Sequence, residues 1–240
     1  MSINVAFEFD MSTTKPEVLT GPAHEMAVLV VGGGGHAAEI CSYVIDMRRG
    51  GLPLRLVGCV DDNKPVGRCG PVEIIGDFST VERLARAEPA LRCIVAVGDN
   101  PTRKRLVERV EALGIPGIWM TVRHPAAWVG QDVTIGPGTV LAPGSIVTAR
   151  VRIGAHVIVN VNASVSHDAV VGDFVNLNPG AVVAGHTRLG DGCYIGAGAT
   201  VIDRISVGEW TTVGAGAAVV RDLPPQATAV GVPARVIKQR

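Results

Sequence analysis

A six-residue repeat occupies the second half of the chain and restricts its fold more than any other feature. Every sixth position from residue 129 to residue 219 carries Val, Ile or Leu. Four residues after each comes a second position that is mostly small, as at Thr139, Ala163 and Ala181. The aliphatic positions are Val129, Ile135, Leu141, Val147, Ile153, Val159, Val165, Val171, Leu177, Val183, Leu189, Ile195, Val201, Val207, Val213 and Val219. This regularity predicts one short strand and one turn that recur without interruption.

Such a hexad pattern is typical of a parallel β-helix, in which each coil forms hydrogen bonds only with its neighbours. Three hexads make one triangular coil, so side chains 18 positions apart stack at about 4.8 Å. The sixteen hexads predict about five coils. Glycine directly follows many aliphatic positions, as at Gly136, Gly154 and Gly172, and we expect it to supply backbone freedom at each bend.

The composition agrees with a core of small aliphatic side chains and excludes several classes of function. Hydrophobic residues make up 47% of the chain and aromatic residues only 4%. The 22 basic residues balance 22 acidic ones, so no basic field exists to attract nucleic acid or an anionic membrane surface. We therefore expect neither a nucleic acid nor a membrane as partner.

The cysteines and the apolar runs bear on the compartment. Five cysteines form an odd set without C-x-x-C spacing, which argues against a disulfide framework and against a zinc ribbon. No apolar run approaches the roughly 18 residues that span a bilayer. These features predict a cytoplasmic protein.

The first half of the chain alternates between strand and helix patterns. The predicted elements are strands over 27–31, 54–60 and 93–97 and helices over 37–47, 81–87 and 102–113. This alternation predicts a small Rossmann-like parallel sheet in an α/β domain. We expect a flexible extension over residues 1–25, the α/β domain over 26–122, and the β-helix with its C-terminal cap over 123–240.

Glycine-rich and polar segments follow the predicted strands, where ligands of parallel sheets bind. These segments are Gly32–His36, Asp61–Asp62 and Gly98–Asn100. Gly32, Gly34 and Ala37 also satisfy G-x-G-x-x-A, with an acidic residue about 25 positions on, which is compatible with NAD. The domain is too short for the full dinucleotide fold, and nothing downstream resembles a dehydrogenase site. The sequence therefore favours a different ligand.

His167 and Asp168 stand at a predicted turn of the repeat, where most positions serve the scaffold. One interpretation is a solvated turn pair, because Asp is an ordinary turn residue. The other is a general base whose imidazole is oriented, and made more basic, by the adjacent carboxylate. Spacing alone does not separate the two.

The motifs appear together in an order that resembles one enzyme family. In chain order they are G-G-G-G-H, D-D, G-D-N, the H-P at His124, the H-D pair, the hexads and a terminal G-V-P-A. From about Val28 to Ile237 the chain is similar to hexapeptide-repeat sugar acetyltransferases (NeuD/PglD-like) that act on nucleotide-linked 4-amino-4,6-dideoxy sugars, relatives of sialic acid O-acetyltransferases. The resemblance implies a left-handed β-helix, although the rule for parallel crossovers would predict the right hand. It also implies a homotrimer and acetyl-CoA as co-substrate, with no required metal.

The resemblance assigns roles to individual residues. His167 becomes the catalytic base and Asp168 its support, and together they imply direct N-acetylation of a UDP- or GDP-linked 4-amino sugar. Gly185 lies 18 residues after His167 and matches a glycine whose N–H contacts the acetyl carbonyl. The implied CoA contacts are Asn176, Ala197 and Ala215, with Asn176 where relatives often have His. The implied nucleotide-sugar contacts are Gly34, Gly35, His36, Asp61, Asp62 and Gly98.

Two alternatives remain at this point, and a third is disfavoured. The second hypothesis is that the acceptor is a sugar hydroxyl, as in sialic acid O-acetylation, since the sequence does not show which group arrives. A non-catalytic trimer that binds a nucleotide sugar also agrees with the Asn at 176. A trimeric carbonic anhydrase needs three converging imidazoles, and His156, His167 and His186 lack the close spacing of that family.

Overall fold

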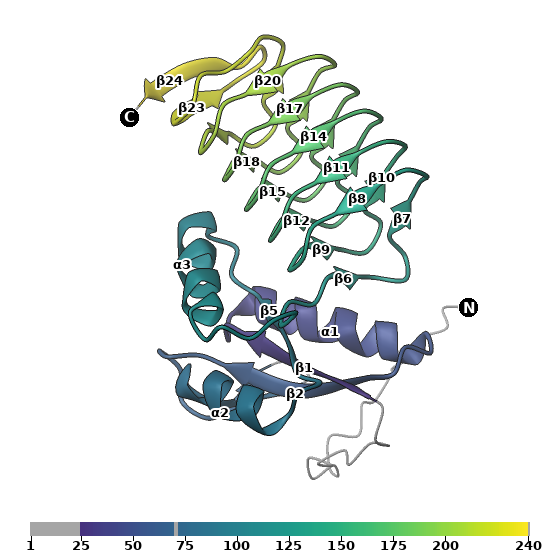
Figure 1. Cartoon of the computed structure of the whole chain (residues 1–240). Coiled ribbons are helices and arrows are strands. Elements are labelled where there is room, and N and C mark those ends of the chain that lie inside the picture. The colour runs from purple at the N-terminus through teal and green to yellow at the C-terminus, as the bar shows by residue number, and fades with distance from the viewer. Residues whose placement is uncertain (1–24, 70–71, 240) are drawn as a thin grey trace, which may run out of the picture.

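The computed structural model describes residues 25–69 and 72–239, and it contains an α/β domain followed by a β-helix (Figure 1). The predicted extension over residues 1–25 falls, apart from Glu25, outside the described part of the chain. In that part, no helix combines the length and apolarity needed to cross a bilayer.

The α/β domain is built on a five-stranded sheet. In spatial order its strands are β3 (Gly67–Cys69), β4 (Val72–Gly76), β2 (Leu54–Val60), β1 (Met26–Val31) and β5 (Arg92–Val95). All pairs are parallel except β3 with β4. The helices are α1 (Gly35–Arg49), α2 (Ser79–Ala87) and α3 (Asn100–Glu111). The parallel sheet is as predicted, whereas the sequence analysis placed no strands at β3 and β4.

Helices cover both faces of this sheet. Val28 and Val30 of β1 pack in the cluster that contains α1, and Leu29 and Val31 pack with residues of α2 and α3. Alternate strand residues point to opposite faces, so one short apolar strand supplies both layers. The α1 cluster also includes Val140 from the first coil of the β-helix, so a single apolar core joins the two domains.

The β-helix consists of two-residue strands that pair with strands 18 positions away, as predicted. The apolar face contains β7 (Trp128–Val129), β10 (Ile146–Val147), β13 (Ser164–Val165), β16 (Val182–Val183), β19 (Thr200–Val201) and β22 (Ala218–Val219). The arginine face contains β8 (Thr134–Ile135), β11 (Arg152–Ile153), β14 (Val170–Val171), β17 (Arg188–Leu189) and β20 (Ser206–Val207). The docked face contains β6 (Val122–Arg123), β9 (Val140–Leu141), β12 (Ile158–Val159), β15 (Asn176–Leu177), β18 (Tyr194–Ile195), β21 (Thr212–Val213), β23 (Ala227–Val230) and β24 (Arg235–Gln239).

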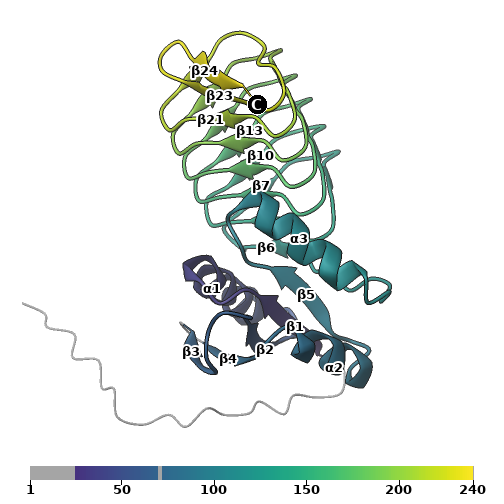
Figure 2. The ribbon, with the colours of Figure 1, turned by 90° about the vertical axis from the view of Figure 1, so that its left-hand side faces the viewer.

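Three edges separate these faces. The open edge, between the apolar and arginine faces, has the corners Asp132, Arg150, Asp168, His186 and Arg204. The covered edge, between the arginine and docked faces, has the corners Gly138, His156, Phe174, Gly192 and Trp210. The third edge, between the docked and apolar faces, has the corners Gly144, Asn162, Gly180, Gly198 and Gly216. In Figure 2 the coils stack above the α/β domain, and β24 lies at the far end.

The hexad register fills the interior of the coils. The aliphatic positions from Leu141 to Val219 are all buried, and so are the smaller positions from Thr139 to Leu223. The antiparallel pair of β23 and β24 closes the last coil, where the sequence predicted a cap. Burial of these side chains excludes water along the whole axis, which is the main source of stability in such a solenoid.

The glycines after the aliphatic positions have a different role from the one expected. Positive φ angles recur at every corner from Asp132 to Gly216, three residues after each aliphatic position. The glycines in question are not at corners, so the expectation that they supply a bend was wrong. A Cβ on Gly136 would lie 2.5 Å from the backbone nitrogen of Ala155 in the next coil. These glycines therefore allow adjacent coils to approach closely.

Candidate active site

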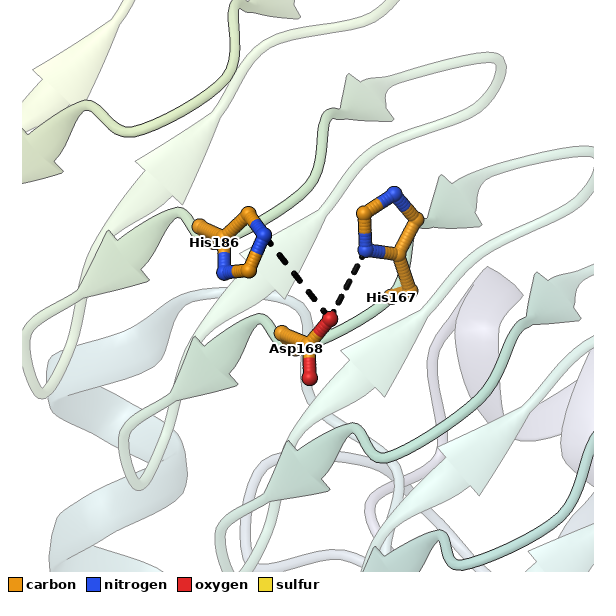
Figure 3. A group of neighbouring side chains, drawn as sticks. All are labelled: His167, Asp168 and His186. Atoms are coloured by element: carbon orange, nitrogen blue, oxygen red, sulfur yellow. Dashed lines mark hydrogen bonds and ion pairs between the residues drawn. The ribbon is translucent and has the colours of Figure 1, made fainter.

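The predicted His167–Asp168 pair lies at the open edge between β13 and β14 (Figure 3). Nδ1 of His167 is 2.8 Å from Oδ2 of Asp168. Because an ionised carboxylate only accepts hydrogen bonds, this contact assigns the proton to Nδ1 and leaves a lone pair on Nε2. The His167 side chain is 55% exposed, so a substrate can reach that lone pair. This is the arrangement that a general base requires.

Arg150 holds the same carboxylate from the preceding coil. Its Nε donates to Oδ1 of Asp168 at 2.8 Å, and its Nη2 donates to Oδ2 at 2.9 Å. The two hydrogen bonds from Arg150 are the largest cause that holds the pKa of Asp168 well below its usual range, and the bond from His167 is the next largest. Asp168 is therefore ionised over the whole range in which an imidazole titrates.

Gly185 lies directly against the imidazole of His167. A Cβ at this position would be 2.8 Å from Cε1 and 3.0 Å from Nε2 of His167, so only glycine leaves room for the ring. Gly185 itself is buried, and among the described residues its N–H has no hydrogen-bond partner. An N–H beside the base is the type of donor that a developing oxyanion needs.

The open edge also groups ligating atoms. His167, Asp168 and His186 each offer one atom within 4.8 Å of the others, and both imidazoles face the carboxylate in Figure 3. Arg150 binds both oxygens of Asp168, so a metal ion would have to displace a guanidinium. His156, the third histidine of the carbonic anhydrase alternative, lies on the covered edge. The geometry therefore favours proton transfer over metal binding.

A cavity of about 430 Å³ lies between the α/β domain and the docked face. Its lining includes His36, Gly98 and Asn176 from the predicted ligand contacts, together with Asn178 and Tyr194. The structure thus joins predicted nucleotide-sugar contacts to a predicted CoA contact.

His36 is positioned for a ligand in this cavity. Its Nδ1 is 2.9 Å from Oε2 of Glu39, while its Nε2 is buried and has no hydrogen-bond partner among the described residues. Burial is the main cause that lowers the pKa of His36, so the ring is neutral near pH 7. The backbone at Gly34 and Gly35, where α1 begins, faces open space in the described part of the chain. Neutral imidazole and free helix N–H groups suit a phosphorylated ligand.

Asn176 is tied into a buried polar network that the sequence analysis did not find. Its Oδ1 accepts from Nη2 of Arg103 at 2.7 Å, and its Nδ2 donates to the carbonyl of Gly98. Arg103 is 1% exposed and also donates to the carbonyls of His156, at 3.0 Å, and Phe174, at 2.8 Å. Burial lowers its pKa to about 10, so it remains charged. In the sequence, Arg103 is one of several basic residues in the predicted helix, and its spacing does not distinguish it from the others.

Asp61 and Asp62 lie beside a second cavity of about 430 Å³ at the carboxyl ends of β1 and β2. Asp61 Oδ2 accepts from the Gly33 N–H at 2.7 Å, which holds the glycine loop in place. Asp62 accepts from Nη1 of Arg109 at 2.7 Å, and this bond is the main cause that lowers the pKa of Asp62. Both carboxylates thus lie at the expected ligand edge, each held by a hydrogen bond within the protein.

The remaining predicted contacts lie elsewhere on the β-helix. Ala197 and Ala215 are exposed beside the third edge, and the Gly216 N–H bonds the Ala197 carbonyl at 2.8 Å, so the two alanines are stacked on successive coils. Gly185 and His167, by contrast, lie on the open edge. A single chain therefore does not bring all the predicted contacts together.

Comparison with known proteins agrees with this two-domain arrangement. Residues 27–110 match the PglD N-terminal domain, and residues 186–221 match the bacterial transferase hexapeptide (six repeats). The acetyltransferase domain of PglB from Neisseria gonorrhoeae FA1090 is 31% identical, with a TM-score of 0.81, and the match covers 89% of this chain and 100% of that one. The chain belongs to the NeuD/PglD-like family of hexapeptide-repeat sugar acetyltransferases. Both the resemblance and the left-handed β-helix are confirmed.

Two further members of the NeuD/PglD-like family are informative. PerB from Caulobacter crescentus, solved with CoA and GDP-perosamine, is 33% identical with a TM-score of 0.79, over 88% of this chain and 97% of that one. The UDP-N-acetylbacillosamine N-acetyltransferase of Bacillus subtilis (strain 168) is 39% identical over 114 residues, or 48% of this chain. That alignment spans 50% of the Bacillus protein, about half the length of this curated relative.

Proposed function

We propose that this chain is an acetyl-CoA-dependent N-acetyltransferase that acetylates the 4-amino group of a UDP- or GDP-linked 4-amino-4,6-dideoxy sugar. The observation that carries the proposal is the His167–Asp168 contact of 2.8 Å with an exposed imidazole. It occurs in a family whose members include an acetyltransferase domain solved with acetyl coenzyme A and a protein solved with CoA and GDP-perosamine.

The proposed reaction is direct transfer without a covalent enzyme intermediate. The amine lone pair attacks the thioester carbonyl, a C–N bond forms, the C–S bond breaks and CoA leaves as the thiolate. Nε2 of His167 accepts a proton from the attacking nitrogen and passes it to the thiolate, so the products are an amide and the CoA thiol. The N–H of Gly185 is the proposed donor to the oxyanion. Base catalysis of this kind contributes roughly 10²- to 10⁴-fold.

The remaining contacts have proposed roles around this step. Gly34, Gly35, His36 and Gly98 bind the phosphorylated part of the acceptor, and the second cavity with Asp61 and Asp62 binds its base or ribose. CoA runs past Ala197 and Ala215. Asn176 contributes by holding the Gly98 loop through its amide, because both ends of that amide are bonded inside the protein.

A homotrimer completes this proposed site. The outward side chains of the apolar face carry no charge and include the exposed Trp128, Ile146 and Val182, whereas the arginine face presents Arg152 and Arg188. The apolar face lies between the open edge and the third edge. When three apolar faces meet around a threefold axis, the open edge of one copy lies against the third edge of the next. His167 of one copy then faces the alanines and the docked face of its neighbour.

Thiol release from acetyl-CoA tests the reaction. We expect release with a UDP- or GDP-linked 4-amino-4,6-dideoxy sugar, and mass spectrometry of the product should show one added acetyl group. Cys41, Cys59, Cys93 and Cys193 are buried, and a blank without acceptor corrects for any enzyme thiol. Release on free sialic acid alone would replace N-acetylation by O-acetylation. Binding of the nucleotide sugar without any release would favour the non-catalytic trimer.

An interface variant tests the assembly. Ile146→Glu places a charge on the apolar face, and we expect it to yield a monomer without activity in analytical ultracentrifugation and thiol-release assays. Thr134→Glu, an exposed position on the arginine face, is the matched control and should stay trimeric and active. An Ile146→Glu protein that remains trimeric would exclude this face as the interface.

A further inference from the structure

The corners of the open edge form a ladder of charged and titratable side chains. Along the edge they are Asp132, Arg150, Asp168, His186 and Arg204. Backbone hydrogen bonds connect the successive turns, including Asp168 N to Ala149 O at 3.1 Å and His186 N to His167 O at 2.9 Å. The ladder is therefore fixed by the coil repeat, with its side chains 18 residues apart.

Arg150 stands between two carboxylates of this ladder and binds only one of them in a bidentate pair. Asp132 lies one coil before it and interacts with it only by charge, whereas Asp168 accepts two hydrogen bonds from it. The planar guanidinium fork fixes the plane of the carboxylate, which a single point charge does not do. Oδ2 of Asp168 is thereby aimed at Nδ1 of His167.

The same contact has a second consequence for the imidazole. Oδ2 of Asp168 is shared between Nη2 of Arg150, at 2.9 Å, and Nδ1 of His167, at 2.8 Å, with Nε2 of His186 at 3.8 Å. The positive charge of Arg150 opposes protonation of His167, while Asp168 favours it. The other titratable group in contact with His167 along this edge is His186, with 5.3 Å between the ring centroids.

We infer that Arg150 is a positioning residue that aligns Asp168 on His167 and limits how strongly this carboxylate favours the imidazolium. The inference rests on the proposed function for its effect on turnover, but its effect on the imidazole is independent of any substrate. No sequence motif indicates Arg150, because its partner is adjacent only after the coil closes.

Two measurements on the full-length trimer test the inference. The first is the NMR titration of the His167 imidazole, whose signal is the one absent from His167→Ala. In Arg150→Gln the midpoint should rise relative to that of the wild type, because a nearby cation has been removed. The second is the pH dependence of kcat, whose acid limb should move in the same direction while kcat falls roughly 2- to 5-fold.

Two further variants make the test specific. Arg150→Lys keeps the charge and should leave the midpoint near that of the wild type, with kcat only partly restored because the fork is lost. Arg152→Gln removes an exposed arginine from β11 of the same coil and should change neither quantity. If Arg150→Gln behaves like Arg152→Gln in both measurements, the inference is wrong. A shifted midpoint together with full activity of His167→Ala would instead reject the base in the proposed function and leave the contact of Arg150 intact.

Discussion

His156 and His167 lie near neighbouring edges of the same solenoid and have opposite surroundings. His156 is 3% exposed, stacks on Phe174 at 5.2 Å between ring centroids and meets Trp119 edge-on at 4.7 Å. Burial, followed by the charge of Arg103, lowers its pKa to about 4. His167 is exposed and faces a carboxylate. The repeat provides equivalent turns, but the α/β domain packs over only one of them. His156 is therefore part of the packed core, whereas the imidazole of His167 is accessible to a substrate.

The largest expected effect separates the two histidines by activity. His167→Ala should lower kcat/KM roughly 10²- to 10⁴-fold with an unchanged melting temperature, since only an exposed base is removed. Steady-state thiol release and thermal unfolding measure the two quantities. Arg204→Ala, at another corner of the open edge, is the control and should retain activity. Full activity of His167→Ala would remove this residue from the mechanism.

The covered edge should respond through stability instead. Arg103→Met removes the donors to the carbonyls of His156 and Phe174 and leaves them buried, which should cost about 3 kcal/mol in the free energy of unfolding. Arg105→Met, an exposed neighbour on α3, should change it by less than about 0.5 kcal/mol. Urea denaturation measures the free energy of unfolding of both variants. An equal loss in the two would show that the buried network of Arg103 does not stabilise the fold more than an exposed arginine does.

Acid should destabilise the covered edge through His156. Its folded pKa of about 4 lies below the ordinary value of 6.5, so the unfolded chain binds the proton more readily. The neutral ring makes its full contribution to the free energy of unfolding above about pH 6.5. This contribution, about 1–3 kcal/mol, is lost as the pH falls toward 4. His156→Asn should remove this portion of the pH dependence in urea titrations at several pH values. An identical pH profile in the variant would contradict the assignment.

The smallest effect concerns the glycine beside the base. Gly185→Ala would place its Cβ 2.8 Å from a carbon of the His167 ring, so the ring must move, and we expect activity to fall roughly tenfold. Gly136→Ala collides with backbone rather than with a side chain and should lower stability. Thiol release and thermal unfolding should therefore rank these two variants in opposite order. The same order in both assays would show that Gly185 is only another scaffold glycine.

The sequence predicts the coil well because its rule is local. Each hexad repeats the same inward positions, so the register of 18 and the buried positions follow from counting. The role of Gly136 and its equivalents was missed, because a sequence shows a glycine but not whether φ or a neighbouring coil requires it. Positive φ falls instead on residues such as Arg150 and Phe174, which rarely adopt it.

The candidate site was predicted less completely, because its contacts cross between elements. His167, Asp168 and Gly185 do lie together, since they are related by one turn and one coil. Asn176 was expected at CoA, but its amide bonds Arg103 and Gly98 across the domain interface. No spacing in the sequence reveals a partner 73 or 78 positions away in a different fold.

The repeat of 18 residues determines on which edge or face a side chain of the solenoid lies and how far along the axis it is. Insertion or deletion of a whole coil between the docked domain and His167 would move the base along the axis by about 4.8 Å and keep it on the open edge. Loss of a single hexad would keep every strand and turn in register but transfer His167 to a different edge. Evolution can therefore lengthen or shorten the reach between acceptor and base in whole coils, whereas a change of one hexad would preserve the fold and abolish the chemistry.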